Sequence, residues 1–175
     1  MLFVLLKKSQ KRALLAVLVF GLLAAFFTGC DNGSTDDDVN IRGTLPSGLV
    51  GKWDSGYDSF EIKSDMVTLE YDDGGYGYGY TGTIEFVSNY DSRSGVIIIE
   101  YSSGAPDTNK PFHAIYYLDY KPGTSVELHI TSDANDPNYS ADTATLNQAI
   151  AKFTRKKMFD HISSDFVGIS VYIKQ

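Results

Sequence analysis

The chain from Leu49 onward consists of short apolar or alternating runs separated by turn residues, a pattern typical of antiparallel β-strands. The predicted strands are residues 49–54, 57–63, 66–71, 76–88, 95–102, 112–121, 124–131 and 166–173. Several breaks are tight turns, such as Asp72-Asp73-Gly74-Gly75 and Lys121-Pro122-Gly123-Thr124. Regular short strands with mostly hairpin-length gaps predict a mostly β domain, either an antiparallel barrel or a sandwich.

Alternation along the strands predicts the face that each one buries, because side chains two residues apart lie on the same face. In 76–88 the larger apolar side chains occupy even positions: Tyr76, Tyr78, Tyr80, Ile84 and Phe86. A second such row consists of Phe112, Ala114, Tyr116, Leu118 and Tyr120. The run 96–99 is apolar on both faces, which indicates a central strand that is also covered from outside.

One α-helix is predicted, at about residues 145–156. Thr145 and Gln148 match a capping box, and Leu146, Ala149, Ile150 and Phe153 then form an apolar stripe. We expect this helix to pack on the outside of the sheet, against the 96–99 strand. Its basic run has two interpretations, favourable charge at the negative end of the helix dipole or contact with anionic headgroups. The run contains Lys152, Arg155, Lys156 and Lys157.

The amino-terminal segment has the three parts of a secretory signal. A basic cluster at residues 7–12 precedes an uncharged run at 13–27. The run is followed by Thr28-Gly29-Cys30. The uncharged run is shorter than the roughly 20 residues that a membrane-spanning helix needs. Cys30 is the only cysteine of the chain, which excludes an intramolecular disulfide and a multi-cysteine zinc site.

The stretch Phe27-Thr28-Gly29-Cys30 resembles the lipobox of bacterial lipoproteins. The resemblance implies that residues 1–29 are a signal peptide removed before Cys30, whose thiol receives a diacylglyceryl group. Two long acyl chains supply on the order of 20 kcal/mol of gross membrane affinity, which suffices for stable anchoring. The predicted location is therefore the bacterial cell envelope, with the membrane leaflet left open.

Residues 30–48 are predicted to be a flexible acidic tether, leading to a barrel domain at 49–175. The segment 31–40 reads DNGSTDDDVN and carries too little apolar mass to offset the entropy of ordering. A calcium site at Asp36-Asp37-Asp38 is the alternative, but regular ligand spacing and a glycine turn do not accompany these residues.

Gly51-Lys52-Trp53, at the first strand of the domain, resembles the G-x-W motif with which lipocalins open their barrel. The order of elements is similar too, with hairpin-length strands, a late helix and a last short strand. The resemblance implies an up-and-down barrel of about eight strands with the helix packed outside. It also implies an arginine over Trp53. The predicted strand 124–131 has no arginine, so Arg93 or Arg155 are the candidates.

An aromatic-lined interior is the candidate ligand site. Glycines between the tyrosines of 76–80 would let a ligand approach their rings, or would form the bends that barrel closure needs around a filled interior. The candidate ligand-binding residues are Trp53, Tyr76, Tyr78, Tyr80, Tyr101, Tyr116 and Tyr120.

Metal binding and catalysis are not expected. His113 and His129 lie on consecutive predicted strands and Glu127 shares a face with His129, so the alternative is a metal site of two histidines and one carboxylate. Both histidines lie opposite the apolar row, however, and should be solvated. The sequence has no G-x-S-x-G, H-E-x-x-H or phosphate-loop motif. We therefore predict no enzyme activity, no metal and no cofactor.

Net charge narrows the choice of partners. The chain carries a formal charge of −7, and the predicted cleavage removes four of the 15 basic residues while retaining all 22 acidic ones, leaving −11. Nucleic acid is therefore a poor partner, because its affinity depends on lysines and arginines that neutralise phosphates.

Two functions remain open from the sequence. The first is a secreted, membrane-anchored lipoprotein that binds a small apolar or aromatic ligand in its barrel without catalysis. The alternative is an envelope or surface interaction lipoprotein with a solid barrel core, whose loops contact an envelope protein or glycan. The first requires an open cavity of roughly 300 Å³ or more, whereas the second requires none.

Overall fold

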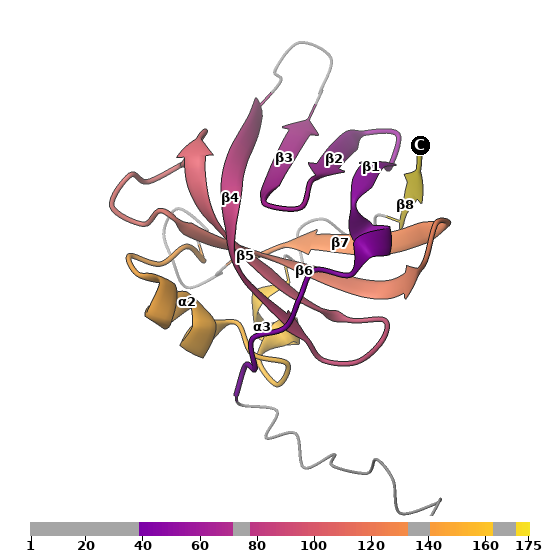
Figure 1. Cartoon of the computed structure of the whole chain (residues 1–175). Helices are drawn as coiled ribbons and strands as arrows, with labels where there is room; N and C mark the ends of the chain where they lie inside the picture. The colour runs from indigo at the N-terminus through magenta and orange to yellow at the C-terminus, as the bar shows by residue number, and fades with distance from the viewer. Residues whose placement is uncertain (1–38, 72–77, 133–140, 163–170) are drawn as a thin grey trace, which may run out of the picture. The chain divides into compact units, whose positions relative to one another are not determined.

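A computed structural model describes residues 39–71, 78–132, 141–162 and 171–175. In this part of the chain, eight antiparallel strands pair in sequence order and close into a barrel, because β8 also pairs with β1 (Figure 1). The strands are β1 (Gly51–Asp54), β2 (Asp58–Ile62), β3 (Met66–Tyr71), β4 (Tyr78–Asn89), β5 (Gly95–Ser103), β6 (Phe112–Lys121), β7 (Ser125–Ile130) and β8 (Val171–Lys174). The predicted antiparallel barrel with an outer helix is confirmed.

The helix begins as predicted but ends earlier. α2 (Leu146–Lys152) has Thr145 as its N-cap, and Thr145 and Gln148 form both hydrogen bonds of a capping box. The helix stops because Phe153 leaves the helical conformation, with φ −96° and ψ 62°. A turn then leads to a short second helix, α3 (Met158–His161). None of the helices within the described residues has the length and apolar content needed to cross a bilayer.

Two apolar cores lie on opposite faces of the sheet. The interior core fills the barrel and includes Trp53, Phe60, Ile97, Ile99 and Tyr117. The outer core lies between the sheet and the helical segment, and its members are Phe86, Val96, Ile98, Ala114, Tyr116, Ala141, Ala149, Phe153 and Met158. The expected burial of the 96–99 run on both faces is confirmed, with α2 packed against β5 and β6.

Register shifts correct the predicted faces of β4 and β6. The pairing of β4 with β5 shifts between Ile84 and Phe86, so Ile84 packs inside the barrel and Phe86 outside. β6 shifts after Leu118, where Asp119 adopts a positive φ of 46°. Strict alternation ends at such bulges, because one extra residue reverses the phase of the side chains.

Trp53 is held at the end of the barrel where the chain enters it. A 3₁₀ turn, η1 (Ser47–Leu49), precedes β1, and the indole Nε1 donates to the carbonyl oxygen of Leu49 at 2.7 Å. The basic side chain over the ring is Lys174, with its Nζ 5.4 Å from the ring centroid, and not Arg93 or Arg155 as expected. Lys174 was not a candidate because the resemblance implied an arginine over this ring.

The predicted flexible tether extends too far into the chain. Residues 39–46, here called the strap, follow the outside of β4 before η1 (Figure 1). Asn40 Nδ2 donates to the carbonyl oxygens of Ile150 and Phe153 at 2.8 and 2.9 Å. The Gly43 N–H donates to the Val87 carbonyl at 2.7 Å. Because these bonds fix the strap to the barrel domain, the part from Asn40 to residue 48 is not a free linker.

Asn40 caps the last carbonyls of α2, so replacing its amide should destabilise the domain. We expect Asn40→Asp to lower the free energy of unfolding by about 1–3 kcal/mol, because a carboxylate loses both bonds and faces the negative end of the helix. The matched control is Asn147→Asp at the exposed start of α2, where the same change should be neutral or slightly stabilising. Urea unfolding of both variants measures this, and equal effects would contradict the assigned role of Asn40.

Candidate functional site

The barrel has two ends with different contents. At the η1 end lie η1, the β6–β7 turn and the last residues of β8. At the opposite end, here called the loop end, the chain connects β3 to β4 and β5 to β6. Because the strands run up and down in sequence order, the first residues of β4 and β6 and the last residues of β5 meet at the loop end.

Three aromatic rings pack together at the loop end. Tyr80 of β4 lies edge-on to Tyr101 of β5, with ring centroids 5.2 Å apart at 82°. The imidazole of His113, the second residue of β6, stacks on Tyr101 at 5.4 Å and 28°. It also meets Tyr80 at 5.3 Å and 66°. These three side chains define the candidate site.

A carboxylate orients the histidine. His113 Nδ1 lies 2.7 Å from Asp142 Oδ1, and both residues are buried, with only 4% of His113 exposed. Asp142 reaches this position because the next residue, Thr143, exchanges two backbone hydrogen bonds with Phe112, the residue before His113. The backbone pairing of Phe112 with Thr143 thus places the imidazole of His113 next to the carboxylate of Asp142.

The position of the proton in the bond between His113 Nδ1 and Asp142 determines whether Nε2 donates or accepts a hydrogen bond. A carboxylate only accepts hydrogen bonds, so Nδ1 carries the proton that is shared with Asp142. In the neutral imidazole, Nε2 is then a bare acceptor. Among the described residues, Nε2 has no hydrogen-bond partner although it is buried. The candidate site therefore holds an oriented acceptor without a partner, next to two tyrosine rings.

Side chains fill the rest of the interior. Trp53, Phe60, Ile97, Ile115 and Tyr117 each have less than 2% of their surface exposed. Near the η1 end, Tyr120 lies edge-on to Trp53 at 6.5 Å and to Tyr117 at 6.4 Å. These side chains occupy the space that a deep ligand would need, so a ligand site is restricted to the loop end.

The predicted pocket residues are consequently divided among several places. Tyr80 and Tyr101 lie in the candidate site, whereas Trp53 and Tyr120 belong to the filled part of the interior. Tyr116 does not line the interior as predicted. It lies in the outer core, where its hydroxyl donates to the Thr154 carbonyl at 3.4 Å and burial raises its pKa. Tyr76 and the side chain of Tyr78 lie outside the described residues.

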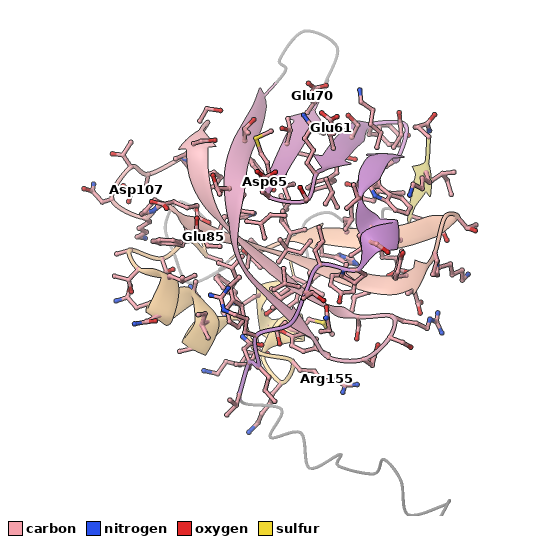
Figure 2. All side chains as sticks on the ribbon, viewed as in Figure 1. Glu61, Asp65, Glu70, Glu85, Asp107 and Arg155 are labelled. Carbon is pink, nitrogen blue, oxygen red and sulfur yellow. The ribbon has the colours of Figure 1, made fainter. Side chains whose placement is uncertain are left out.

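An acidic hollow of about 230 Å³ lies on the outer rim of the loop end. It is lined by Asp54, Gly56, Tyr57, Asp58, Ser59, Glu70 and Tyr71. Tyr57 is 80% exposed, and Asp58 accepts a hydrogen bond of 2.7 Å from the hydroxyl of Tyr172. Figure 2 shows Glu70 at this end of the barrel. These carboxylates disfavour the approach of an anion to the loop end.

The expected solvation of the histidines is wrong for His113, which points into the barrel. His129 lies on the other face of the sheet, where its Nε2 is 3.6 Å from Glu127 Oε2. The two imidazoles are not cross-strand neighbours either, since His129 pairs with Tyr116. No group of three metal-ligating side chains is present among the described residues.

Sequence reasoning missed His113 and Asp142 as site residues. The available signal was that β6 is apolar on both rows, with Ile115 and Tyr117 on the row of His113. A strand that buries both faces buries its histidine whichever way it points. Asp142 had no comparable signal, because its contact depends on a backbone bridge between distant segments.

Comparisons with known proteins do not assign the chain to a family. No family model, no curated protein and no solved structure matches it.

Replacing the imidazole of His113 should lower the free energy of unfolding, because the imidazole is hydrogen-bonded to the buried carboxylate of Asp142. We expect His113→Phe, which retains a ring of similar size, to lose about 1–3 kcal/mol of unfolding free energy because the buried Asp142 carboxylate loses its hydrogen bond to the imidazole. The double variant His113→Phe with Asp142→Leu should be more stable than the single one. Urea unfolding measures both, and additive losses would contradict the pairing.

His129 should make the stability depend on pH. Burial lowers the pKa of His129, against the opposing effect of Glu127. The unfolded chain therefore binds the proton at a higher pH than the folded chain, so this residue costs stability as the pH falls below about 6.5. We expect His129→Gln to lose less stability than the wild type between about pH 7.5 and about pH 5.5, as measured by urea midpoints. An equal loss in both proteins would contradict this assignment.

Proposed function

We propose that the chain is a bacterial envelope lipoprotein, anchored through acylated Cys30, whose barrel binds a small aromatic or apolar ligand at the loop end. The observation that carries this proposal is the buried Nε2 of His113, which has no partner among the described residues. A buried acceptor without a hydrogen bond costs roughly 1–3 kcal/mol. A ligand that donates to Nε2 recovers that energy, so binding is favoured.

The surroundings define the chemistry of the ligand. The rings of Tyr80 and Tyr101 favour a flat, apolar or aromatic body. The bare acceptor of His113 favours an O–H or N–H group on that body. The acidic rim disfavours carboxylates and phosphates, as does the net charge, which is −7 for the full chain and −11 after the proposed cleavage. The ligand class is therefore a small uncharged or cationic aromatic compound that carries a hydrogen-bond donor.

Binding accounts for the His113–Asp142 pair better than catalysis does. Such a pair activates a nucleophile of the protein itself only when a hydroxyl or thiol lies within about 2.6–3.2 Å of Nε2. Among the described residues, Nε2 has no such neighbour, and the sequence has no nucleophile motif. We therefore propose that the barrel binds its ligand without a chemical step.

The filled interior favours a second candidate function. The side chains between the η1 end and the middle of the barrel are almost fully buried, as a solid core requires. In that case the protein is a tethered envelope interaction module, and its loops contact a protein or glycan. The two candidates differ in one measurable property, the binding of small molecules at the loop end.

Matched pairs of probes test the ligand site in the chain after residue 29. Indole and phenol carry a donor, whereas 1-methylindole and anisole keep the ring and lack it. We expect calorimetry to show about tenfold tighter binding of the donors than of their methylated partners, because one hydrogen bond to a buried acceptor is worth roughly 1.4 kcal/mol. Benzoate should bind more weakly than either donor because of the acidic rim.

The matched variants are His113→Asn and Tyr57→Phe. The amide of Asn can take the place of Nδ1 and retain the bond to Asp142, but it has no counterpart of Nε2, so it should abolish the preference for donors. Tyr57→Phe on the exposed rim should leave that preference unchanged. If no probe binds, or if donors and methylated probes bind equally, the tethered interaction module replaces the ligand binder.

A further inference from the structure

The strap fixes the point at which the anchor reaches the barrel domain. Asn40 is bonded to the last carbonyls of α2, and only residues 31–38 separate Cys30 from Val39, the first residue of the strap. Eight residues span at most about 28 Å even when fully extended. The surface around Asn40 is therefore held close to whatever membrane contains the acyl chains of Cys30.

That surface is basic in an otherwise acidic protein. Eleven basic residues follow residue 29, and five of them lie on the strap, on α2 and on the turn to α3. These five, here called the basic surface, are Arg42, Lys152, Arg155, Lys156 and Lys157. The guanidinium of Arg42 lies 4.8 Å from the ring of Phe86, and Lys152 Nζ lies 5.7 Å from the ring of Phe153. Both rings belong to the outer core, so Arg42 on the strap and Lys152 on α2 contact the same cluster of apolar side chains.

The helix dipole does not account for this charge. α2 ends at Lys152, so residues 155–157 lie beyond its last turn, where the dipole effect falls off. All three are exposed. Arg155 forms an ion pair of 3.5 Å with Asp91, but both side chains are nearly half exposed, and such pairs are weak. The charge at residues 155–157 therefore remains accessible from solvent, whereas Lys152 is half-buried and its Nζ donates to the Ala141 carbonyl at 2.9 Å.

Apolar side chains lie next to the basic surface. Val39 is 58% exposed and Ile41 is 71% exposed, on either side of Asn40. Basic residues beside exposed apolar ones are typical of surfaces that lie in the membrane interface. Figure 2 shows Arg155 on the opposite side of the domain from Glu61 and Glu70, so the charge is distributed unevenly.

We infer that the basic surface, together with Val39 and Ile41, lies against the membrane that holds Cys30 and contacts anionic lipid headgroups. This inference rests on the proposed function in one respect, the acylation of Cys30. It does not depend on the ligand site. The tether contributes opposite charge through Asp31 and Asp36 to Asp38, so the contact is made by the strap and the helical segment.

A single-cysteine labelling experiment on the full chain tests this inference. Because Cys30 is the only cysteine, an acylated chain produced in a bacterium takes a thiol-reactive fluorophore only at an introduced one. The two exposed, uncharged labelling positions are Ala151→Cys on α2 and Ser103→Cys at the loop end. Each labelled protein is placed in vesicles that carry nitroxide headgroups, made of phosphatidylcholine with or without phosphatidylglycerol.

We expect quenching at position 151 to be about three times that at position 103 when phosphatidylglycerol is present, and to fall with added salt. Arg155→Glu with Lys157→Glu should remove this difference. The control, Lys63→Glu with Lys121→Glu, changes the net charge equally but lies elsewhere and should retain the difference.

Equal quenching at both positions would overturn the inference, because the barrel would then turn freely on its tether. The same holds if quenching at position 151 does not respond to phosphatidylglycerol, or responds only after Asp36, Asp37 and Asp38 are replaced by Asn, since the tether would then cover the basic surface. Mass spectrometry of the unsubstituted chain, after treatment with the fluorophore, tests separately whether Cys30 is acylated. Labelling at Cys30 itself would show that the anchor is absent.

Discussion

β5 is buried on both faces, and covering both of them determines how the other elements are arranged. Ile97 and Ile99 point into the barrel, while Val96 and Ile98 point outward, and all four are fully buried. Burial of each aliphatic side chain stabilises the fold by about 1.5–3 kcal/mol, but only if both faces are covered. The outer face therefore requires a cover, and α2 with its following turn supplies it.

The cover in turn determines where the chain enters and where the candidate site forms. The strap is fixed by Asn40 to the end of α2, and the segment leading into α2 pairs with the start of β6 through Thr143 and Phe112. That pairing brings Asp142 to His113 at the loop end. The outer core and the candidate site are thus linked by one stretch of backbone, although they lie on opposite faces of the sheet.

The sequence predicted the elements more reliably than their faces. Eight strands, the capping box at Thr145 and the outer position of the helix follow from local patterns. The faces of β4 and β6 did not follow, because the shifts near Glu85 and Asp119 depend on pairing with neighbouring strands. Tyr116 was assigned to the interior and His113 to solvent because β6 buries both faces, and the row that contains Tyr116 was taken as the inner one. Tyr80 and Tyr101 were predicted as site residues, but the buried acceptor beside them was not.

The strap could not be separated from the tether by composition, because residues 31–48 change gradually from acidic to mixed. Its attachment depends on a side-chain amide that meets helix carbonyls more than a hundred residues away. Contacts of such range leave no local pattern. The same limit applies to Lys174, which lies over Trp53 from the last strand and donates to the carbonyls of Gly48 and Val50.

The candidate site depends on a bare, oriented Nε2 that His113 presents at the loop end. Nitrogen-15 NMR of the histidine-labelled chain, free and with indole added, measures this most directly. We expect the free protein to have its proton on Nδ1 and an unbonded Nε2, and we expect indole to shift the Nε2 resonance in the direction of an accepted hydrogen bond. A free protein in which Nε2 carries the proton, or already accepts a hydrogen bond from the chain itself, would contradict the claim.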